Sequence, residues 1–251
     1  MFIDTTSCPG FTIRVLNKSF LAENNNNNNK TPSHHHRDHL ISMVATSFAE
    51  GEPCCKFLGI TAELLQEHLV KALVDKTIEE ELSLVCIDNE TGSIVATMLN
   101  EDFYDTMNPD EEACEALARD LPEAIPIFAL LEHLETRLVE RRFGSTTGGV
   151  MKQREVLHAF MGATCKEYSG RGLASCLRKL TAEYAREAGF AHVVVEPTNP
   201  ATQHIWTNKM GGTVECRLEA KDFIMPDGSK PFVSDTGSSM EKDAIIVMLT
   251  L

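Results

Sequence analysis

The sequence predicts an α/β fold in which helices cover both faces of a mixed central sheet, and three observations lead to this prediction. An apolar segment, residues 156–165, runs into a glycine-containing loop over 169–174 that opens directly into an amphipathic helical pattern. A continuous apolar strand over 191–196 follows, and a right-handed crossover places it parallel to the first. Two apolar runs within residues 82–99 flank a turn-forming stretch, which indicates an antiparallel hairpin. Parallel and antiparallel pairs together predict a mixed sheet.

The N-terminal elements follow from periodicity and stop signals. Residues 11–16 alternate as a short strand. A helical pattern then runs from Asp38 and stops before Pro53, because proline disfavours helix in the residue before it. Thr61 stands at the N-cap position of a second helix. Six consecutive asparagines and three histidines predict a disordered loop insertion over 22–37, since a polar tract cannot bury apolar surface. The histidines are the ligand type of a metal site, but they have no partner acid, so a low-complexity spacer is favoured.

The C-terminal elements are read in the same way. An acidic stretch over 101–123 interrupts the sequence before a third helix, whose leucines recur at helical spacing over 127–138. A flexible link over 144–149 leads into the strand at 156–165. After the strand at 191–196, we expect a short helix near 202–210 and two final strands, near 213–219 and 244–249.

Length and composition fit one globular domain over residues 1–251. The net charge of −14 and the lack of a basic stripe argue against nucleic acid or an anionic membrane as the main partner. The eight cysteines show no C-x-x-C pair or regular spacing, so we expect reduced thiols. No secretory signal and no apolar run of ~18 residues is visible, which predicts a cytoplasmic protein. We expect a monomer or a dimer.

The loop at 169–174 is the most informative local feature. Two glycines that lead from a strand into a helix aim backbone N–H groups and a positive helix end at one point, where an anion binds. A Walker A loop is excluded, because Gly172 is followed by Leu173 and Ala174 in place of Lys and Ser or Thr. A dinucleotide fingerprint needs a third glycine where Ser175 stands, which weakens that alternative.

The loop and the order of elements resemble the GNAT superfamily of N-acetyltransferases. The family's pyrophosphate loop is Arg/Gln-x-x-Gly-x-Gly/Ala, and Ser169-Gly170-Arg171-Gly172-Leu173-Ala174 matches it at the two small residues but has Ser169 at the usual Arg or Gln position. The segments at 48–53, 127–135 and 196–205 are similar to the arylalkylamine (dopamine-type) branch. The resemblance implies the GNAT fold, a mixed central sheet with a splayed parallel strand pair, and an acetyl-CoA-binding core over 150–217.

The resemblance also implies acetyl-CoA as co-substrate and a small amine as the other substrate, without a metal. The cofactor-binding residues would be Ser169, Gly170, Arg171, Gly172, Leu173 and Ala174 at the pyrophosphate, Gly162, Ala163, Thr164 and Cys165 along the pantetheine arm, and Asn199 beyond the second strand. One N–H on this arm, of Ala163 or a neighbour, would polarise the thioester carbonyl. An acetyl-cysteine intermediate on Cys165 is disfavoured, because buried cysteine is commonly inert.

The expected catalytic residues are Glu52, Thr198, Thr202 and His158. An aliphatic ammonium loses its proton only near pH ~10, so a base is needed, and Glu52 occupies the place of the family's proposed base. His158 and Glu196 are reserve bases. The short helix lacks the tyrosine that usually protonates the thiolate, which leaves Thr198 and Thr202 as the nearest hydroxyls.

The alternatives are an acetyltransferase acting on a polyamine, an amino acid or a protein lysine, and a non-catalytic acetyl-CoA-binding module.

Overall fold

The computed structural model describes residues 8–23, 33–144, 151–234 and 236–251. Within them lies one seven-stranded sheet with the order β1-β2-β3-β4-β5-β7-β6. All neighbouring strands are antiparallel except β4 and β5, which are parallel as predicted. The strands are β1 Phe11–Val15, β2 Leu84–Asp88, β3 Ile94–Asp102, β4 Val156–Thr164, β5 His192–Val195, β6 Thr213–Glu219 and β7 Asp243–Thr250.

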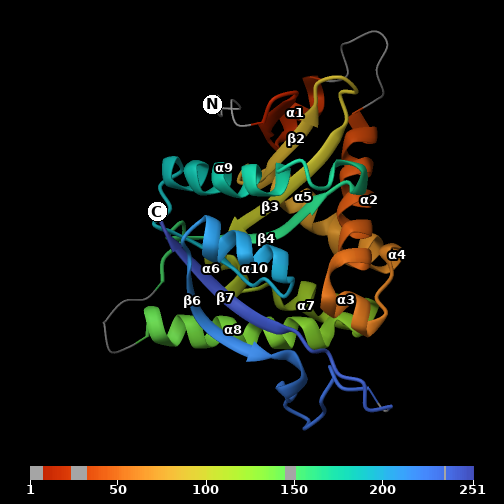
Figure 1. Cartoon of the computed structure of the whole chain (residues 1–251), viewed down its shortest axis with the longest axis vertical. Coiled ribbons are helices and arrows are strands. Elements are labelled where there is room, and N and C mark those ends of the chain that lie inside the picture. The colour runs from red at the N-terminus through yellow and green to blue at the C-terminus, as the bar shows by residue number, and fades with distance from the viewer. Residues whose placement is uncertain (1–7, 24–32, 145–150, 235) are drawn as a thin grey trace.

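Helices cover both faces of this sheet (Figure 1). Helix α9 packs on one face through Leu173, Leu177 and Leu180, which share a core with β2, β3 and β4. Helices α2, α5 and α8 contribute to two cores on the opposite face. The α-helices are α1 Lys18–Glu23, α2 Ser33–Gly51, α3 Pro53–Leu58, α4 Ala62–Leu65, α5 Lys71–Glu80, α6 Phe103–Met107, α7 Glu111–Asp120, α8 Ile125–Arg142, α9 Leu173–Glu187 and α10 Pro200–His204; a π-helical turn, Gln66–Val70, joins α4 to α5, and another, Ile205–Lys209, continues α10.

A β-bulge in β4 decides which side chains face which helix. The register against β3 shifts so that Leu99 pairs with Met161 while Asn100 pairs with Ala159. The extra residue, Phe160, reverses the alternation of side chains along the strand. Ala159 therefore packs toward α9, whereas Met161 packs in the core on the α2 face.

The parallel pair separates near its middle. Pairing between β4 and β5 ends at His158 and Val194, while β4 continues for six more residues to Thr164. The two strands are thus splayed at their carboxyl ends, as predicted. The loop expected to bind an anion and the turn after β5 both start at this gap.

Several expectations need correction. Both ends of the insertion expected to be disordered over 22–37 are helical, because α1 extends through Glu23 and α2 begins at Ser33; residues 24–32 lie outside the described ones. The acidic stretch over 101–123 is no interruption but contains the end of β3, α6 and α7. Most of the link expected at 144–149 lies outside the described residues.

The cysteine expectation also fails for one pair. Cys8 and Cys176 form a disulfide between the segment before β1 and helix α9, with 6.9 Å between their Cα atoms. The other six cysteines are free thiols, as expected. Among the helices in the described ranges, none combines the length and the apolar character that crossing a membrane requires.

Candidate active site

A cleft of about 320 Å³ opens where β4 and β5 separate. Its walls come from the end of α2, the middle of β3 and β4, the glycine loop, α9 and the segment after β5. The residues that line this cleft include Phe48, Glu52, Phe160, Gly162, Thr164, Ser169, Ala174, Arg178, Glu196, Thr198, Asn199, Thr202 and Trp206.

A second, largely apolar pocket adjoins the cleft. Its walls are Ile60, Leu65 and Leu69 from the α4–α5 region, Phe128 and Leu131 from α8, and neighbouring apolar side chains. Five residues line both cavities: Phe48, Glu52, Phe160, Glu196 and Thr198. The two carboxylates and the threonine hydroxyl therefore lie at the junction between a polar cleft and an apolar pocket.

Local helix chemistry fixes Glu52 at this junction. Glu52 is the N-cap of α3 and has extended backbone angles, and its side chain accepts a hydrogen bond of 2.6 Å from the N–H of Cys55. Pro53 at the first helical position favours this cap, since it has no N–H to satisfy. The other carboxylate oxygen accepts a hydrogen bond from the hydroxyl of Thr198. The sequence prediction thus placed Glu52 and Thr198 in one site, although they are 146 residues apart.

The glycine loop has the backbone geometry of an anion site. Gly170 and Gly172 have φ angles of +79° and +81°, which residues with a side chain rarely adopt. Gly172 is the N-cap of α9 and offers no side chain to its first N–H groups. These donors and the positive end of the helix dipole are available to a ligand.

The β4 ladder shows which N–H groups face the gap. The N–H of Cys165 donates to the carbonyl of Val95 over 2.8 Å, so this pair is a hydrogen-bonded one. Because such pairs alternate in an antiparallel ladder, the N–H of Ala163 also points to β3, while those of Gly162 and Thr164 point to the gap. The expected oxyanion donor was the N–H of Ala163 or of a neighbour, and only the neighbours present an N–H to the gap.

The structure brings together most, but not all, of the predicted site residues. The cleft is lined by Glu52, Thr198, Thr202, Gly162, Thr164, Ser169, Ala174 and Asn199. It is not lined by Ala163, Cys165, Gly170, Arg171, Gly172, Leu173 or His158. Leu173 is a core residue of α9, and Ala163 is buried on the α2 face. The guanidinium of Arg171 lies over the ring of Tyr168, 4.6 Å from its centre.

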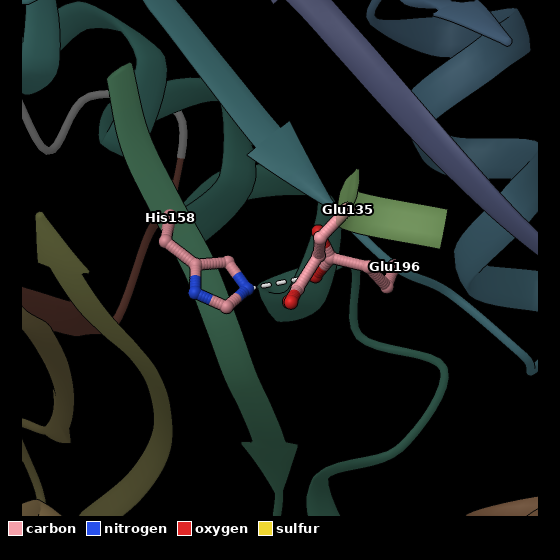
Figure 2. Close-up of side chains that lie close together, drawn as sticks. All are labelled: Glu135, His158 and Glu196. Atoms are coloured by element: carbon pink, nitrogen blue, oxygen red, sulfur yellow. Dashed lines mark hydrogen bonds and ion pairs between the residues drawn. The ribbon is translucent and has the colours of Figure 1, made fainter. Parts of the chain in front are cut away.

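His158 is buried under the sheet between two carboxylates. Its Nε2 lies 2.7 Å from Oε2 of Glu196, and its Nδ1 lies 3.1 Å from Oε1 of Glu101. The side chains of His158 and Glu196 point toward each other, and Glu135 reaches the same place from α8 (Figure 2). Only Glu196 of these groups lines the cleft. His158 is therefore a support for Glu196, not a base that an amine could reach.

Burial and charge oppose each other in this cluster. Burial alone would lower the pKa of His158, but Glu196 and Glu101 outweigh it and raise this pKa well above its usual value. Burial would raise the pKa of Glu101, but His158 and Lys76 lower it to about 2. The imidazole is thus a cation that lies between the carboxyl groups of Glu101 and Glu196. Burial, followed by the charge of Glu196, raises the pKa of Glu135, which keeps that carboxyl protonated at neutral pH.

The same cluster has the donor types of a metal site. Ligand atoms of Glu135, His158 and Glu196 lie within 4.8 Å of one another. A metal ion would have to displace the protons held by Glu135 and His158 and open the hydrogen bond between His158 and Glu196. We therefore interpret the cluster as an ionic support for Glu196.

Cys165 does not have the properties of a nucleophile. Burial raises the pKa of its thiol, and the charge of Glu167 raises it further. The thiolate that nucleophilic attack requires is therefore disfavoured. A direct transfer without a cysteine intermediate remains the expectation.

No family model matches the chain. One curated relative, the beta-alanyl-bioamine nonribosomal peptide synthetase ebony of Drosophila melanogaster, is 25% identical over 158 residues, which are 62% of this chain but only 16% of that protein. The chain thus spans less than a fifth of the length of that relative.

Solved structures match far more of the chain. The C-terminal condensation domain of Ebony, in complex with beta-alanyl-dopamine, has a TM-score of 0.69 at 21% identity over 86% of this chain and 95% of that one. Arylalkylamine N-acetyltransferase 2 of Aedes aegypti has a TM-score of 0.67 at 18% identity, and a polyamine N-acetyltransferase of Drosophila melanogaster has 0.68 at 18%. These two cover 96% of this chain and 98% and 100% of their own.

The chain has the GNAT acetyltransferase fold. The predicted fold class, including the splayed parallel pair, is confirmed.

Sequence reasoning missed the one basic residue that lines this cleft among the described residues, Arg178. It lies one helical turn after Ala174 on the buried face of α9, and its residue exposure is 7%. The sequence offered no clear signal, because position 178 lies off the spacing of the inward-facing residues 173, 177, 180 and 184. Phe48 and Phe160, which line both cavities, were also missed, and only the bulge in β4 explains the position of Phe160.

Proposed function

We propose that this chain is an acetyl-CoA-dependent N-acetyltransferase that moves an acetyl group to a primary amine, a small arylalkylamine. The observation that carries the proposal is the position of Glu52, a carboxylate at the junction of the cleft and the apolar pocket. An aromatic ring fits the apolar pocket, and the amine that it carries would then reach Glu52. The GNAT fold supports this function, since relatives with this fold are named arylalkylamine and polyamine N-acetyltransferases.

The cleft suits a CoA thioester in three ways. The uncapped N-terminus of α9 and the glycine loop, including residues 170–174, offer N–H donors to the pyrophosphate. The N–H groups of Gly162 and Thr164 face the gap along β4, where the pantetheine arm would take the place of a strand. Asn199 also lines the cleft, although its side chain is used to cap α10 and to contact Gly51. Acetyl-CoA supplies the activated acetyl group.

Glu52 would act as the base for the amine. Its carboxylate would accept a proton from the ammonium and leave a nitrogen lone pair that attacks the thioester carbonyl carbon. The backbone N–H groups of Gly162 or Thr164 stabilise the oxygen that becomes negative. The carbon–sulfur bond then breaks and releases the CoA thiolate and the amide, without an acyl-enzyme intermediate.

Thr198 would complete the proton transfer. Its hydroxyl is hydrogen-bonded to Glu52. Once Glu52 holds the proton of the amine, it would pass that proton to the oxygen of Thr198, and the hydroxyl proton of Thr198 would move to the leaving sulfur. Thr202 also lines the cleft, but its hydroxyl is not bonded to Glu52. We therefore assign the role of acid to Thr198 before Thr202. A thiolate with a pKa near ~8.5 needs only weak help to leave.

A second candidate function is acyl transfer to an amine in which the acceptor or the acyl donor carries a second amino group. Oε1 of Glu196 is buried and has no hydrogen-bond partner among the described residues, although Glu196 lines both cavities beside Glu52. This oxygen could accept a second ammonium, either of a polyamine acceptor or of an aminoacyl donor. The names of the polyamine N-acetyltransferase and of the Ebony domain bound to beta-alanyl-dopamine are consistent with these two versions.

One assay separates these functions. The purified chain is given acetyl-CoA with tryptamine, dopamine, spermidine, an amino acid or a lysine peptide, and the release of CoA thiol is measured. We expect turnover with tryptamine and dopamine. Turnover with spermidine alone would favour the second candidate. Stabilisation by acetyl-CoA without thiol release in any mixture would identify a non-catalytic binding module and refute the enzyme.

A further inference from the structure

A buried arginine lies under the first turn of α9 without a counter-charge. Arg178 is 7% exposed and lines the cleft. Its Nη1 donates 2.9 Å to the carbonyl of Ala174, and its Nε has no hydrogen-bond partner. Over the described residues, no carboxylate forms an ion pair with it. Burial lowers the pKa of this guanidinium to about 10, so the group remains a cation at neutral pH.

The glycine in β4 makes room for this cation. A Cβ built on Gly162 would lie 3.2 Å from Nη2 of Arg178 and 3.1 Å from Sδ of Met98. After the bulge in β4, position 162 faces α9, so any larger residue would meet the guanidinium. The guanidinium is therefore enclosed between α9 and the edge of β4 that faces the gap.

A second unpartnered donor lines the same cleft. Nε1 of Trp206, a residue that is 1% exposed, has no hydrogen-bond partner. Buried donors in folded proteins are nearly always paired, and a buried charge without a partner is costly. Two such donors in one cleft indicate a ligand that brings several acceptors and a negative charge.

We propose that Arg178 binds the phosphate of a 4′-phosphopantetheine arm and supplies the charge that Ser169 does not provide. The side chain points back toward the N-terminus of α9, as helical side chains do, and its Nη1 lies at the carbonyl of Ala174 in the first turn, next to the uncapped N–H groups. Trp206 donates to an amide carbonyl of the same arm. The inference rests on the proposed function, because it assumes that the cleft takes a pantetheine thioester.

The test compares Arg178→Met with Arg186→Met, a control on an exposed position of the same helix. Calorimetry measures the dissociation constants of CoA, 4′-phosphopantetheine and pantetheine. We expect Arg178→Met to weaken CoA and 4′-phosphopantetheine by about ten- to a hundredfold, as for a charge-assisted hydrogen bond, and pantetheine by less than threefold. Arg186→Met should weaken none of them. Without ligand, the melting temperature of Arg178→Met should equal or exceed that of the unchanged protein, since an unpaired buried charge is removed.

The outcomes distinguish this inference from the proposed function. If the unchanged protein binds CoA and Arg178→Met binds it equally well, the role of Arg178 is refuted and the function stands. An equal loss for pantetheine would show that the guanidinium contacts the amides, which refutes the phosphate assignment. If the unchanged protein binds neither CoA nor 4′-phosphopantetheine, both proposals fail. A lower melting temperature of the ligand-free variant would show that Arg178 is a structural residue.

Discussion

Glu52 has two roles in the structure, and suitable variants separate them. Its carboxylate caps α3 through the N–H of Cys55 and accepts the hydroxyl of Thr198, and it is also the proposed base. Glu52→Gln keeps an amide oxygen that can accept from Cys55, and the hydroxyl of Thr198 can rotate to accept from the amide. It removes the base while preserving the cap. Glu52→Ala removes both.

The expected magnitudes follow from these contacts. Loss of an N-cap costs about 0.5–2 kcal/mol, and a buried hydroxyl without its partner costs about 1–3 kcal/mol. Glu52→Ala should therefore lose about 2 kcal/mol or more, which lowers the melting temperature of a domain of this size by about 4–8 °C. Glu52→Gln should stay within about 1 kcal/mol of the unchanged protein. Both should lose about 10²- to 10⁴-fold in kcat, the usual contribution of a positioned base.

Asp110 offers a matched control. It caps α7 in the same way, accepting 2.8 Å from the N–H of Ala113, but it lines neither cavity. Asp110→Ala should lower the melting temperature by a similar cap contribution and leave kcat unchanged. The measurements are thermal unfolding and the release of CoA thiol across pH. If Glu52→Gln retains kcat and its pH profile, Glu52 is not the base, and the assignment of the junction is refuted.

Three further predictions concern the rest of the site. Thr198→Val should lower kcat about tenfold at constant KM for the amine, whereas Thr202→Val should not; equal effects would contradict the assignment of the acid. Leu69→Asn places an amide in the apolar pocket and should raise KM for arylalkylamines while leaving the dissociation constant of CoA unchanged, as enzyme kinetics and calorimetry can show. Burial, followed by the charge of Glu196, raises the pKa of Glu135 to about 8. The protonated carboxyl therefore stabilises the folded state fully below the pKa of the unfolded chain, near ~4.3, and this contribution is lost as the pH rises through 8. Glu135→Gln should therefore become more stable relative to the unchanged protein between pH 5 and pH 9, and a constant difference in melting temperature would contradict the raised pKa.

Local patterns were sufficient to predict most of the sheet. The apolar run ending at Thr164, the hairpin of β2 and β3, and the run of β5 each carry their own signal, and a right-handed crossover orders β4 and β5. Helix α7 shows where this reasoning ends. None of its residues is buried, and Leu117 is its one large apolar side chain, so its acidic composition predicts an interruption where the structure has a helix.

The candidate site was predictable where a backbone motif or a turn defines it. Gly170 and Gly172 indicate the anion-binding loop, and Pro53 indicates the turn that positions Glu52. The support of Glu196 was not predictable, since Glu135 comes from α8 and His158 from β4, and their approach depends on how that helix packs. Arg178 was missed because its role depends on its surroundings in the fold, where no carboxylate among the described residues pairs with its charge.

The separation of β4 and β5 explains why the site lies at this place in the fold. Pairing ends at His158 and Val194, so β4 continues to Thr164 with one edge unpaired inside the sheet. N–H and C=O groups at an interior edge require partners, because the surrounding core excludes water from much of it. A closed sheet would satisfy them with a longer β5, but the chain turns away after Val195 and places Glu196 and Thr198 at the gap. The gap beside β4 therefore has the shape of an absent strand, and a linear ligand with alternating donors and acceptors would fill it. Every polar side chain of the proposed mechanism borders this gap.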